Sequence, residues 1–219
     1  MNIRNFFEWL EDFFGSGTFT ATAADNAPML IKDTSSSGTP TYAYVDGSES
    51  GEIKLTFDNT NEVQIITLYQ GNNLQFDIDK IREVTFRLKV GQTNDSATTL
   101  VFGLAGDQND APDSVAQNCW FKASGGNTVV LETDDGTTDT DDVATGQSLG
   151  TTHKDFTISF ACGKSDIRFF IDGQPVGQGQ TFSMANYSGS LQVFLQFQKT
   201  ADTNVDSVTV DMIQVRGIR

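Results

Sequence analysis

The densest group of side chains with chemical potential is an acidic segment in the second half of the chain. Residues 132–142 read Glu-Thr-Asp-Asp-Gly-Thr-Thr-Asp-Thr-Asp-Asp. Such segments suit Ca²⁺, which accepts about six to eight hard oxygen ligands in variable geometry. The spacing differs from that of an EF-hand loop, so two interpretations fit: a calcium site, or the solvated tip of a hairpin. The predicted calcium ligands are Glu132, Asp134, Asp135, Asp139, Asp141 and Asp142.

A second acidic loop adds to this prediction. Residues 107–113 read Asp-Gln-Asn-Asp-Ala-Pro-Asp, and Pro112 stiffens the loop. We expect the two acidic loops to approach each other in space. Calcium is the only cofactor that the sequence suggests, because the chain has one histidine (His153) and two cysteines, and neither a phosphate-cradling loop nor a Cys/His metal spacing occurs.

The net charge excludes several classes of partner. The chain has 219 residues, with 14 Lys and Arg against 29 Asp and Glu, and its formal net charge is −15. Nucleic-acid binding needs clustered Lys and Arg, and attachment to anionic membranes needs a basic surface. We therefore expect no nucleic-acid partner and no membrane partner. Because acidic residues interrupt the N-terminal apolar stretch, we expect no secretion signal and synthesis in a cytoplasm.

From residue 17 onward, apolar side chains recur with a period of two. The alternation is clearest in segments 84–90, 156–160, 167–171, 191–198 and 208–212, and Gly with Asp or Asn separates many of the runs. One apolar and one mixed face per strand is typical of antiparallel sheets packed as a sandwich. The pattern predicts an all-β jelly-roll sandwich that forms one domain, residues 17–219.

Two stretches carry a resemblance to a known superfamily. The first is the hairpin Asp155-Phe-Thr-Ile-Ser-Phe with Asp166-Ile-Arg-Phe-Phe-Ile-Asp-Gly-Gln-Pro-Val-Gly, and the second is Leu100-Val-Phe-Gly-Leu-Ala-Gly-Asp followed by Cys119-Trp-Phe-Lys. Both resemble strands of concanavalin A-like (laminin G-like) sandwiches, over about residues 80–215. The chain further resembles decoration or fibre proteins of tailed-bacteriophage virions. The resemblance implies an antiparallel concanavalin A-like jelly-roll sandwich.

The resemblance leaves the activity open, since this fold hosts lectins, glucanases, lyases and structural modules. Its glucanases carry an E-x-D-x-x-E strand whose carboxylates share one face. Here Glu132 and Asp134 share a face, but Gly136 takes the next position in phase. Its alginate-lyase-like members use a Gln-Ile-His context, which His153 lacks. We therefore predict that the protein is not an enzyme.

Lectin-like members often bind sugars on the mixed face of a curved sheet. Sugars suit aromatic faces beside amide and guanidinium groups, because their CH groups stack on rings while their hydroxyls form hydrogen bonds. We favour the alternative in which a flanking loop or a neighbouring subunit covers the two phenylalanines of this set. The predicted glycan-binding residues are Arg168, Phe170, Gln192, Phe194 and Gln196.

The N-terminal segment differs from the rest of the chain. Its apolar side chains recur with the spacing of one helical stripe, acidic residues take the other side, and Gly15 and Gly17 follow. The pattern predicts a short amphipathic helix within residues 1–16. Either this helix folds back over its own domain, or it docks on a partner or on copies of itself; we favour docking, because the stripe is too apolar to remain in water. The predicted docking residues are Ile3, Phe6, Phe7, Leu10, Phe13 and Phe14.

Together with these observations, the resemblance to virion proteins implies a non-enzymatic structural protein of a bacteriophage virion, either capsid-associated or part of a fibre. The helix would anchor the chain to other virion proteins or to copies of itself, and the sandwich would be displayed outward. The predicted location is the virion, assembled in the host cytoplasm. The alternative is a carbohydrate-binding, lectin-like module.

Overall fold

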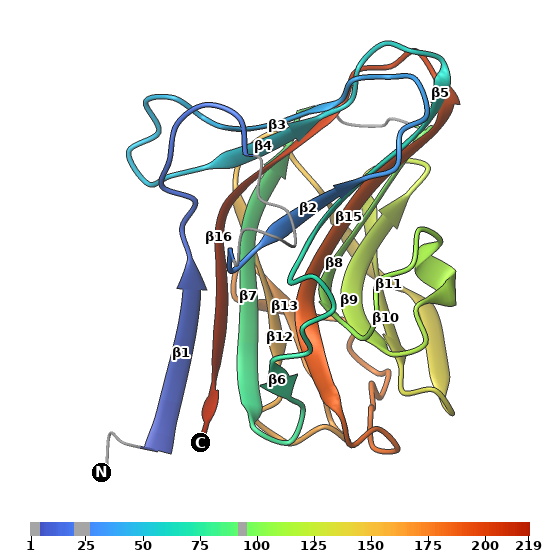
Figure 1. Ribbon diagram of the computed structural model, residues 1–219. Coiled ribbons are helices and arrows are strands. Elements are labelled where there is room, and N and C mark those ends of the chain that lie inside the picture. Colours follow the sequence, from blue (N-terminus) through green and yellow to red (C-terminus); the bar gives the residue numbers. More distant parts are fainter. Residues whose placement is uncertain (1–4, 20–26, 92–95) are drawn as a thin grey trace.

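The computed structural model describes residues 5–19, 27–91 and 96–219, and it consists of two packed antiparallel sheets (Figure 1). We call the first eight-stranded sheet sheet A. β1 pairs with β16 beside the main path of this sheet. The strands, in spatial order, are β14 (Gln174–Val176), β13 (Arg168–Ile171), β12 (Lys154–Ser159), β7 (Ile81–Val90), β16 (Ser207–Ile218), β4 (Ile53–Thr56) and β3 (Thr41–Tyr44), with β1 (Phe6–Glu11) on β16.

Sheet B is the second eight-stranded sheet. It contains β11 (Asp139–Ser148), β10 (Thr128–Asp134), β9 (Asn118–Ser124), β8 (Thr98–Ala105), β15 (Ser190–Asp202), β5 (Glu62–Tyr69) and β2 (Leu30–Asp33), with β6 (Phe76–Asp77) on β15. A short 3-10 helix, η3 (Pro112–Ser114), lies in the loop between β8 and β9. Among the described residues there is no helix with the length and apolar character needed to cross a membrane.

Aromatic side chains fill the space between the sheets. Phe102 of sheet B contacts Phe156 of sheet A edge to face, with ring centroids 4.9 Å apart, and stacks beside Phe121 at 5.4 Å. Phe86 and Phe169 complete this group from sheet A, at 5.6 Å from Phe102 and 5.2 Å from Phe121. All five side chains are buried. The period-two alternation of the sequence therefore places its large apolar residues on the two inner faces.

The predicted all-β antiparallel sandwich is confirmed. The alternating segments form β7, β12, β13, β15 and β16. The Asp172-Gly173 turn between β13 and β14 has positive φ at both residues, 49° and 73°. Asp and Gly accept this left-handed backbone more readily than most residues, and two such residues in succession suit a tight hairpin.

The predicted N-terminal helix is wrong, because this segment forms β1. Residues Phe6 to Glu11 pair antiparallel with Ile218 to Ile213 of β16. β4 pairs only with the first part of β16, so the second part offers a free edge, and β1 occupies it. A partner strand far away in the sequence satisfies one edge of the β1 backbone, and this outweighs the helical spacing of its side chains.

The docking residues separate onto the two faces of β1 and the segment after it. Phe7 points inward and stacks near Phe76, with ring centroids 6.2 Å apart, and Phe13 is buried. Phe6, Leu10 and Phe14 are exposed. Ile3 lies outside the described residues. One part of the set therefore packs on its own domain, and another part faces solvent.

Candidate functional site

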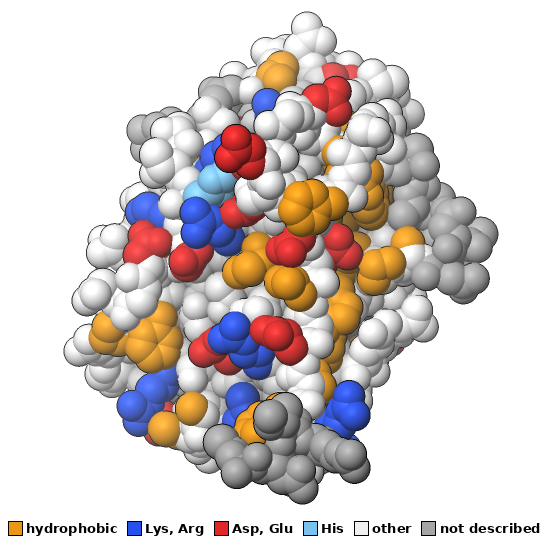
Figure 2. All heavy atoms as spheres, turned by 90° about the vertical axis from the view of Figure 1, so that its left-hand side faces the viewer, with side chains coloured by type: hydrophobic (Ala, Val, Ile, Leu, Met, Phe, Trp, Pro, Cys, Tyr) orange, Lys and Arg blue, Asp and Glu red, His pale blue; other side chains and the backbone are white. Residues whose placement is uncertain are grey.

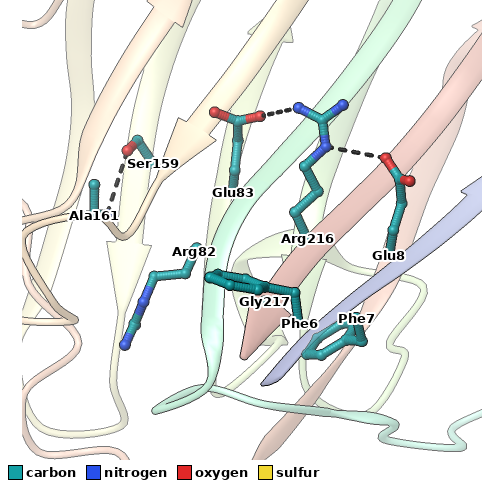
Figure 3. Close-up of a pocket in the computed structure, with 9 residues that line it drawn as sticks. All are labelled: Phe6, Phe7, Glu8, Arg82, Glu83, Ser159, Ala161, Arg216 and Gly217. Atoms are coloured by element: carbon teal, nitrogen blue, oxygen red, sulfur yellow. Dashed lines mark hydrogen bonds and ion pairs between the residues drawn. The ribbon is translucent and has the colours of Figure 1, made fainter. Parts of the chain in front are cut away.

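A hollow of about 490 Å³ lies on the outer face of sheet A, where β1, β16, β7 and β12 run side by side (Figure 3). It is larger than the hollow on the outer face of sheet B described below. Its lining combines aromatic rings, two arginines, two glutamates and a serine. The residues that line it are Phe6, Phe7, Glu8, Arg82, Glu83, Ser159, Ala161, Arg216 and Gly217.

The registers of the four strands align the polar residues of the hollow in one row. Ser159 of β12 lies opposite Glu83 of β7, Glu83 lies opposite Arg216 of β16, and Arg216 lies opposite Glu8 of β1. Their chain neighbours Val84 and Val215 are buried, so the strand alternation directs the row outward. Figure 2 shows acidic and basic side chains side by side on this face.

Arg216 is the centre of this row. Its Nε lies 3.1 Å from the Glu8 Oε1, and its Nη1 lies 3.3 Å from the Glu83 Oε1 (Figure 3). The Gln214 Nε2 also donates to the Glu8 Oε1, at 2.6 Å. These contacts fix the guanidinium and both carboxylates in place without removing them from solvent. A fixed guanidinium can donate, and fixed carboxylates can accept, several hydrogen bonds with one ligand.

Phe6 and Arg82 complete the hollow. The Phe6 side chain is 48% exposed, and its ring lies among Arg82, Glu83 and Arg216 (Figure 3). The Arg82 Nη1 donates to the Ile81 carbonyl at 3.0 Å. Within the described chain, no ion pair joins Arg82 to a carboxylate. The site therefore offers an aromatic surface next to a guanidinium that keeps free donors.

Two of the predicted glycan-binding residues lie on this same face. Arg168 of β13 continues the polar row, opposite Ser159, and Phe170 lies opposite Thr157. Arg168 forms an ion pair with Asp166, with its Nη2 2.9 Å from the Oδ2. Neither residue lines the hollow itself.

The other three predicted residues lie on sheet B and are buried, so the predicted set is not one surface. The loop of residues 106–117, which we call the covering loop, lies over them. The Gln196 Nε2 donates to the Asp110 carbonyl at 2.8 Å, and the Gln192 Nε2 donates to the Gly106 carbonyl at 2.7 Å. Phe194 stacks near Trp120 at 5.9 Å. A flanking loop therefore covers Phe194, as the alternative interpretation expected.

The acidic segment lines a separate hollow of about 190 Å³ on the outer face of sheet B. Its residues are Asp113, Asn118, Lys122, Glu132, Asp134, Asp139, Asp141 and Asp142. Asp113 comes from the second acidic loop and lies 3.2 Å from the Lys122 Nζ, while Asp142 lies 3.5 Å from it. The expected approach of the two acidic loops is therefore confirmed, and Lys122 joins them.

Glu132 is the buried centre of this second hollow. Its Oε2 accepts a hydrogen bond from the Trp120 Nε1 at 2.7 Å, and its Oε1 lies 2.7 Å from the Lys122 Nζ. Burial raises the pKa of Glu132, and the contacts with Lys122 and Trp120 oppose that shift. Burial favours a lower pKa for Lys122, but its contacts with Glu132 outweigh this and raise that pKa. Glu132 is thus a buried partner of Lys122 rather than part of an exposed hairpin tip.

Five of the six predicted calcium ligands line this second hollow, and Asp135 does not. Asp135 points elsewhere and holds a turn, because its Oδ1 accepts from the backbone N–H of Thr137 and Thr138, and its Oδ2 accepts from Asn186. Among residues 5–19, 27–91 and 96–219, no group of three or more His, Cys, Asp or Glu side chains is arranged to hold a metal ion. Calcium binding stays a prediction without geometric support.

Sequence reasoning did not find the row of Ser159, Glu83, Arg216 and Glu8. These residues come from four strands that are far apart in the chain, and each is unremarkable within its own strand. Their alternation places each on a polar face, but only the strand registers bring them together. Arg82 and Lys122 were not found for the same reason.

Comparison with known proteins shows the fold. No protein-family model and no curated protein sequence matches the chain. Solved structures do match. The GH16 protein of the Bacteroides ovatus mixed linkage glucan PUL, in complex with a G4G4G3G product, is 9% identical with a TM-score of 0.65, covering 94% of this chain and 99% of that chain. The Emp47p carbohydrate recognition domain is 11% identical with a TM-score of 0.57, covering 94% and 96%.

A third structure comes from a bacteriophage. A carbohydrate esterase of the Shiga toxin-encoding bacteriophage phi24B is 15% identical with a TM-score of 0.50, covering 93% of this chain and 99% of that chain. The protein thus has the concanavalin A-like jelly-roll fold of lectin and glycosidase domains. The resemblance to phage proteins holds only in part. At these identities the likeness shows the fold alone, and a fold shared by glycosidases and binding domains leaves the enzyme status open.

Proposed function

We propose that the protein is a carbohydrate-binding β-sandwich module and that a saccharide binds in the hollow on the outer face of sheet A. One observation carries this proposal. The half-exposed Phe6 ring lies beside Arg82 and the fixed Arg216–Glu83 pair in a hollow of about 490 Å³.

The chemistry of a sugar ring fits this lining. Its CH groups form an apolar face that can lie on Phe6, and its hydroxyls both donate and accept hydrogen bonds. Glu8 and Glu83 accept, Arg82 and Arg216 donate, and Ser159 does both. The two ion pairs hold these groups before a ligand arrives, so less side-chain freedom is lost on binding.

The structural neighbours support the same class of function. The Emp47p domain is a carbohydrate recognition domain, and the Bacteroides ovatus protein was solved with a glucan product. Both share the fold of this chain over more than nine tenths of its length.

We propose binding without hydrolysis. Glu132 is the carboxylate that best matches the glucanase pattern, and both its oxygens already have partners, Lys122 and Trp120. Gly136 stands where that pattern has its last carboxylate. A general acid needs a proton that it can deliver to a ligand, and the contacts of Glu132 point to structural use of its carboxylate.

A structural role in a tailed-phage virion is our second candidate. Its support is the exposed apolar part of β1 and the segment that follows, with Phe6, Leu10 and Phe14 in solvent. The predicted virion location is a proposal of the same kind. Mass spectrometry of purified virions tests both, and a carbohydrate-binding module carried on a particle would satisfy both candidates.

A glycan array followed by titration calorimetry tests the carbohydrate proposal. We expect the wild-type chain to bind a subset of oligosaccharides and F6A to lose about tenfold in affinity, or 1.4 kcal/mol. F14A is the matched control, because Phe14 is 69% exposed but does not line the hollow. An array without binding refutes the function, whereas equal losses in F6A and F14A refute the proposed site.

A further inference from the structure

The exposed apolar side chains of this protein concentrate at one strand. Five large hydrophobic side chains are exposed in the described part of the chain, and three belong to β1 or the residues just after it. Phe6 is 48% exposed, Leu10 is 46% exposed and Phe14 is 69% exposed. A concentration of this kind marks an interaction surface more often than scattered exposed residues do.

The backbone of β1 is also open on one side. In the described chain β1 pairs only with β16, and Figure 1 shows no labelled strand beyond β1 on its other side. The Arg219 N–H donates to the Asn5 carbonyl at 2.9 Å, so Asn5 faces β16. Backbone groups in an antiparallel pair alternate in direction. The N–H and C=O groups of Phe6, Glu8 and Leu10 therefore face the open edge.

We propose that a second copy of this chain pairs with β1 along this edge, antiparallel and about a two-fold axis at Glu8. A two-fold axis requires a strand whose sequence matches itself when reversed. The sequence Phe6-Phe-Glu-Trp-Leu10 has this property in chemical type. Phe6 lies opposite the partner's Leu10 on the outer face, and Phe7 lies opposite the partner's Trp9 on the inner face.

This register also uses the backbone groups that the edge leaves open. Phe6 and the partner's Leu10 exchange N–H and C=O hydrogen bonds. Glu8 exchanges the same two bonds with the partner's Glu8. Residues 5, 7, 9 and 11 keep their bonds to β16. A pairing shifted by one residue would direct bonding groups away from each other, and among the registers that remain the match of Phe6 with Leu10 selects the one centred on Glu8.

The distribution of charge favours contact between two copies at β1 over contact at other parts of the surface. Each copy has a net charge of −15, so two copies repel each other over most of their surfaces. At β1, Arg216 lies 3.1 Å from Glu8. The axis therefore brings the two Glu8 carboxylates together with two Arg216 guanidiniums, each of which also pairs with the Glu83 of its own copy. The same guanidinium offsets the repulsion between the two Glu8 side chains.

The paired chains would share one continuous sheet. Sheet A of one copy would continue through β1 into sheet A of the other, and the backbone edge of β1 would no longer face water. Both hollows would open on the same face, one on each side of the axis. A dimer of this form would present two copies of the proposed saccharide site to one glycan-bearing surface. Binding through both sites would raise the avidity for that surface.

Sedimentation velocity over a range of concentrations tests the pairing. We expect wild-type dimers at about 100 µM, where an interface with micromolar Kd is largely occupied. L10K places a charge on the edge and should give monomers, whereas V63K changes an equally exposed side chain on β5 and should leave the dimer intact. Monomers of the wild type at this concentration, or dimers of L10K, overturn the proposal. Circular dichroism checks that each variant is folded.

A cysteine at Glu8 tests the register. Residues that exchange both backbone bonds lie about 5.5 Å apart between Cα atoms, within the range that a disulfide spans. In a C162S background, which removes the exposed native thiol, E8C should form a covalent dimer under mild oxidation. F14C, which is exposed but lies beyond the strand, should not. Crosslinking of F14C instead of E8C overturns the Glu8-centred pairing.

Discussion

On the outer face of sheet B, the covering loop lies over Gln192, Phe194 and Gln196 and accepts hydrogen bonds from both amides. On the outer face of sheet A, by contrast, the side chains of Glu8 and Arg216 are 53% and 54% exposed, and they pair only with one another and with their neighbours. The same residue types occur on both faces: aromatic rings, amides, carboxylates and cations.

The difference lies in what satisfies the polar groups. On sheet B the chain supplies the partners itself, so Trp120, Glu132 and Lys122 form a closed group. On sheet A the partners are shared with water, which a ligand can replace. A polar group that has a buried partner contributes to the stability of the fold. A polar group that is oriented by its neighbours but still exposed to solvent is available for ligand binding. Changes on sheet B should therefore affect the free energy of unfolding, and changes on sheet A should affect binding.

Truncation of one phenylalanine on each face gives the largest expected contrast. F194A removes a ring that is fully buried against Trp120 and should cost about 3–5 kcal/mol of unfolding free energy. F170A removes a half-buried ring on sheet A and should cost about 1 kcal/mol. Urea denaturation followed by circular dichroism measures both. Equal losses would show that the covering loop does not seal the face of sheet B.

The ion pair beneath the covering loop comes next. K122M removes the ammonium that lies 2.7 Å from Glu132 and leaves a carboxylate that is 3% exposed. We expect a loss of about 2–3 kcal/mol, because Trp120 still donates to the other oxygen. The double variant K122M/E132Q should recover part of the loss, since the buried charge is then gone. A double variant as unstable as the sum of the single ones would contradict this account.

The sequence was sufficient for the strands whose two faces differ. Segments around Phe86, Phe156 and Leu195 alternate cleanly, and each forms the expected strand because one side must be buried. Segment 6–11 was misassigned as a helix, since Phe6, Phe7 and Leu10 fit a helical stripe as well as a strand. The strand forms because the free edge of β16, about two hundred residues away, pairs with this segment. No local sequence pattern reports that edge.

The candidate site was predictable only in part, for a related reason. Alternation identifies Arg168 and Phe194 as residues on polar faces, but it does not say which sheet each belongs to. It also does not say that residues 106–117 fold over one of those faces. The row through Arg216 depends on three strand registers, and registers are set by long-range packing.

A carboxylate on sheet B gives a smaller, pH-dependent effect. Glu62 of β5 accepts from the Ser36 hydroxyl at 2.5 Å, from the Ser37 N–H at 2.7 Å and from the Gly38 N–H. The hydrogen bond from the Ser36 hydroxyl, the main cause, and those from the Ser37 and Gly38 N–H groups lower the pKa of Glu62 from 4.5 to about 2. A lowered pKa stabilises the fold above the unfolded value, and this contribution disappears as the pH falls from 4.5 to about 2.

E62Q measures this contribution directly. The variant should be less stable than the wild type near neutral pH, and the difference should shrink across the same pH range. Urea midpoints at several pH values give the comparison. A difference between wild type and E62Q that stays constant down to pH 2 would show that the segment 36–38 does not hold the ionised carboxylate.

The smallest effect on stability should come from the open face itself. E83Q removes one of two carboxylates at Arg216, which keeps Glu8 at 3.1 Å, and all three side chains are exposed enough for water to screen the pair. The unfolding free energy should change by less than about 0.5 kcal/mol. Saccharide affinity should nevertheless fall about fivefold, because a neutral amide replaces a charged acceptor at the wall of the hollow. A loss of stability as large as that of K122M would mean that the row on sheet A holds the fold together, and the distinction between the two faces would fail. A stable variant with unchanged affinity would leave the distinction intact and move the saccharide away from Glu83, toward Phe6 and Arg82 on the other side of the hollow.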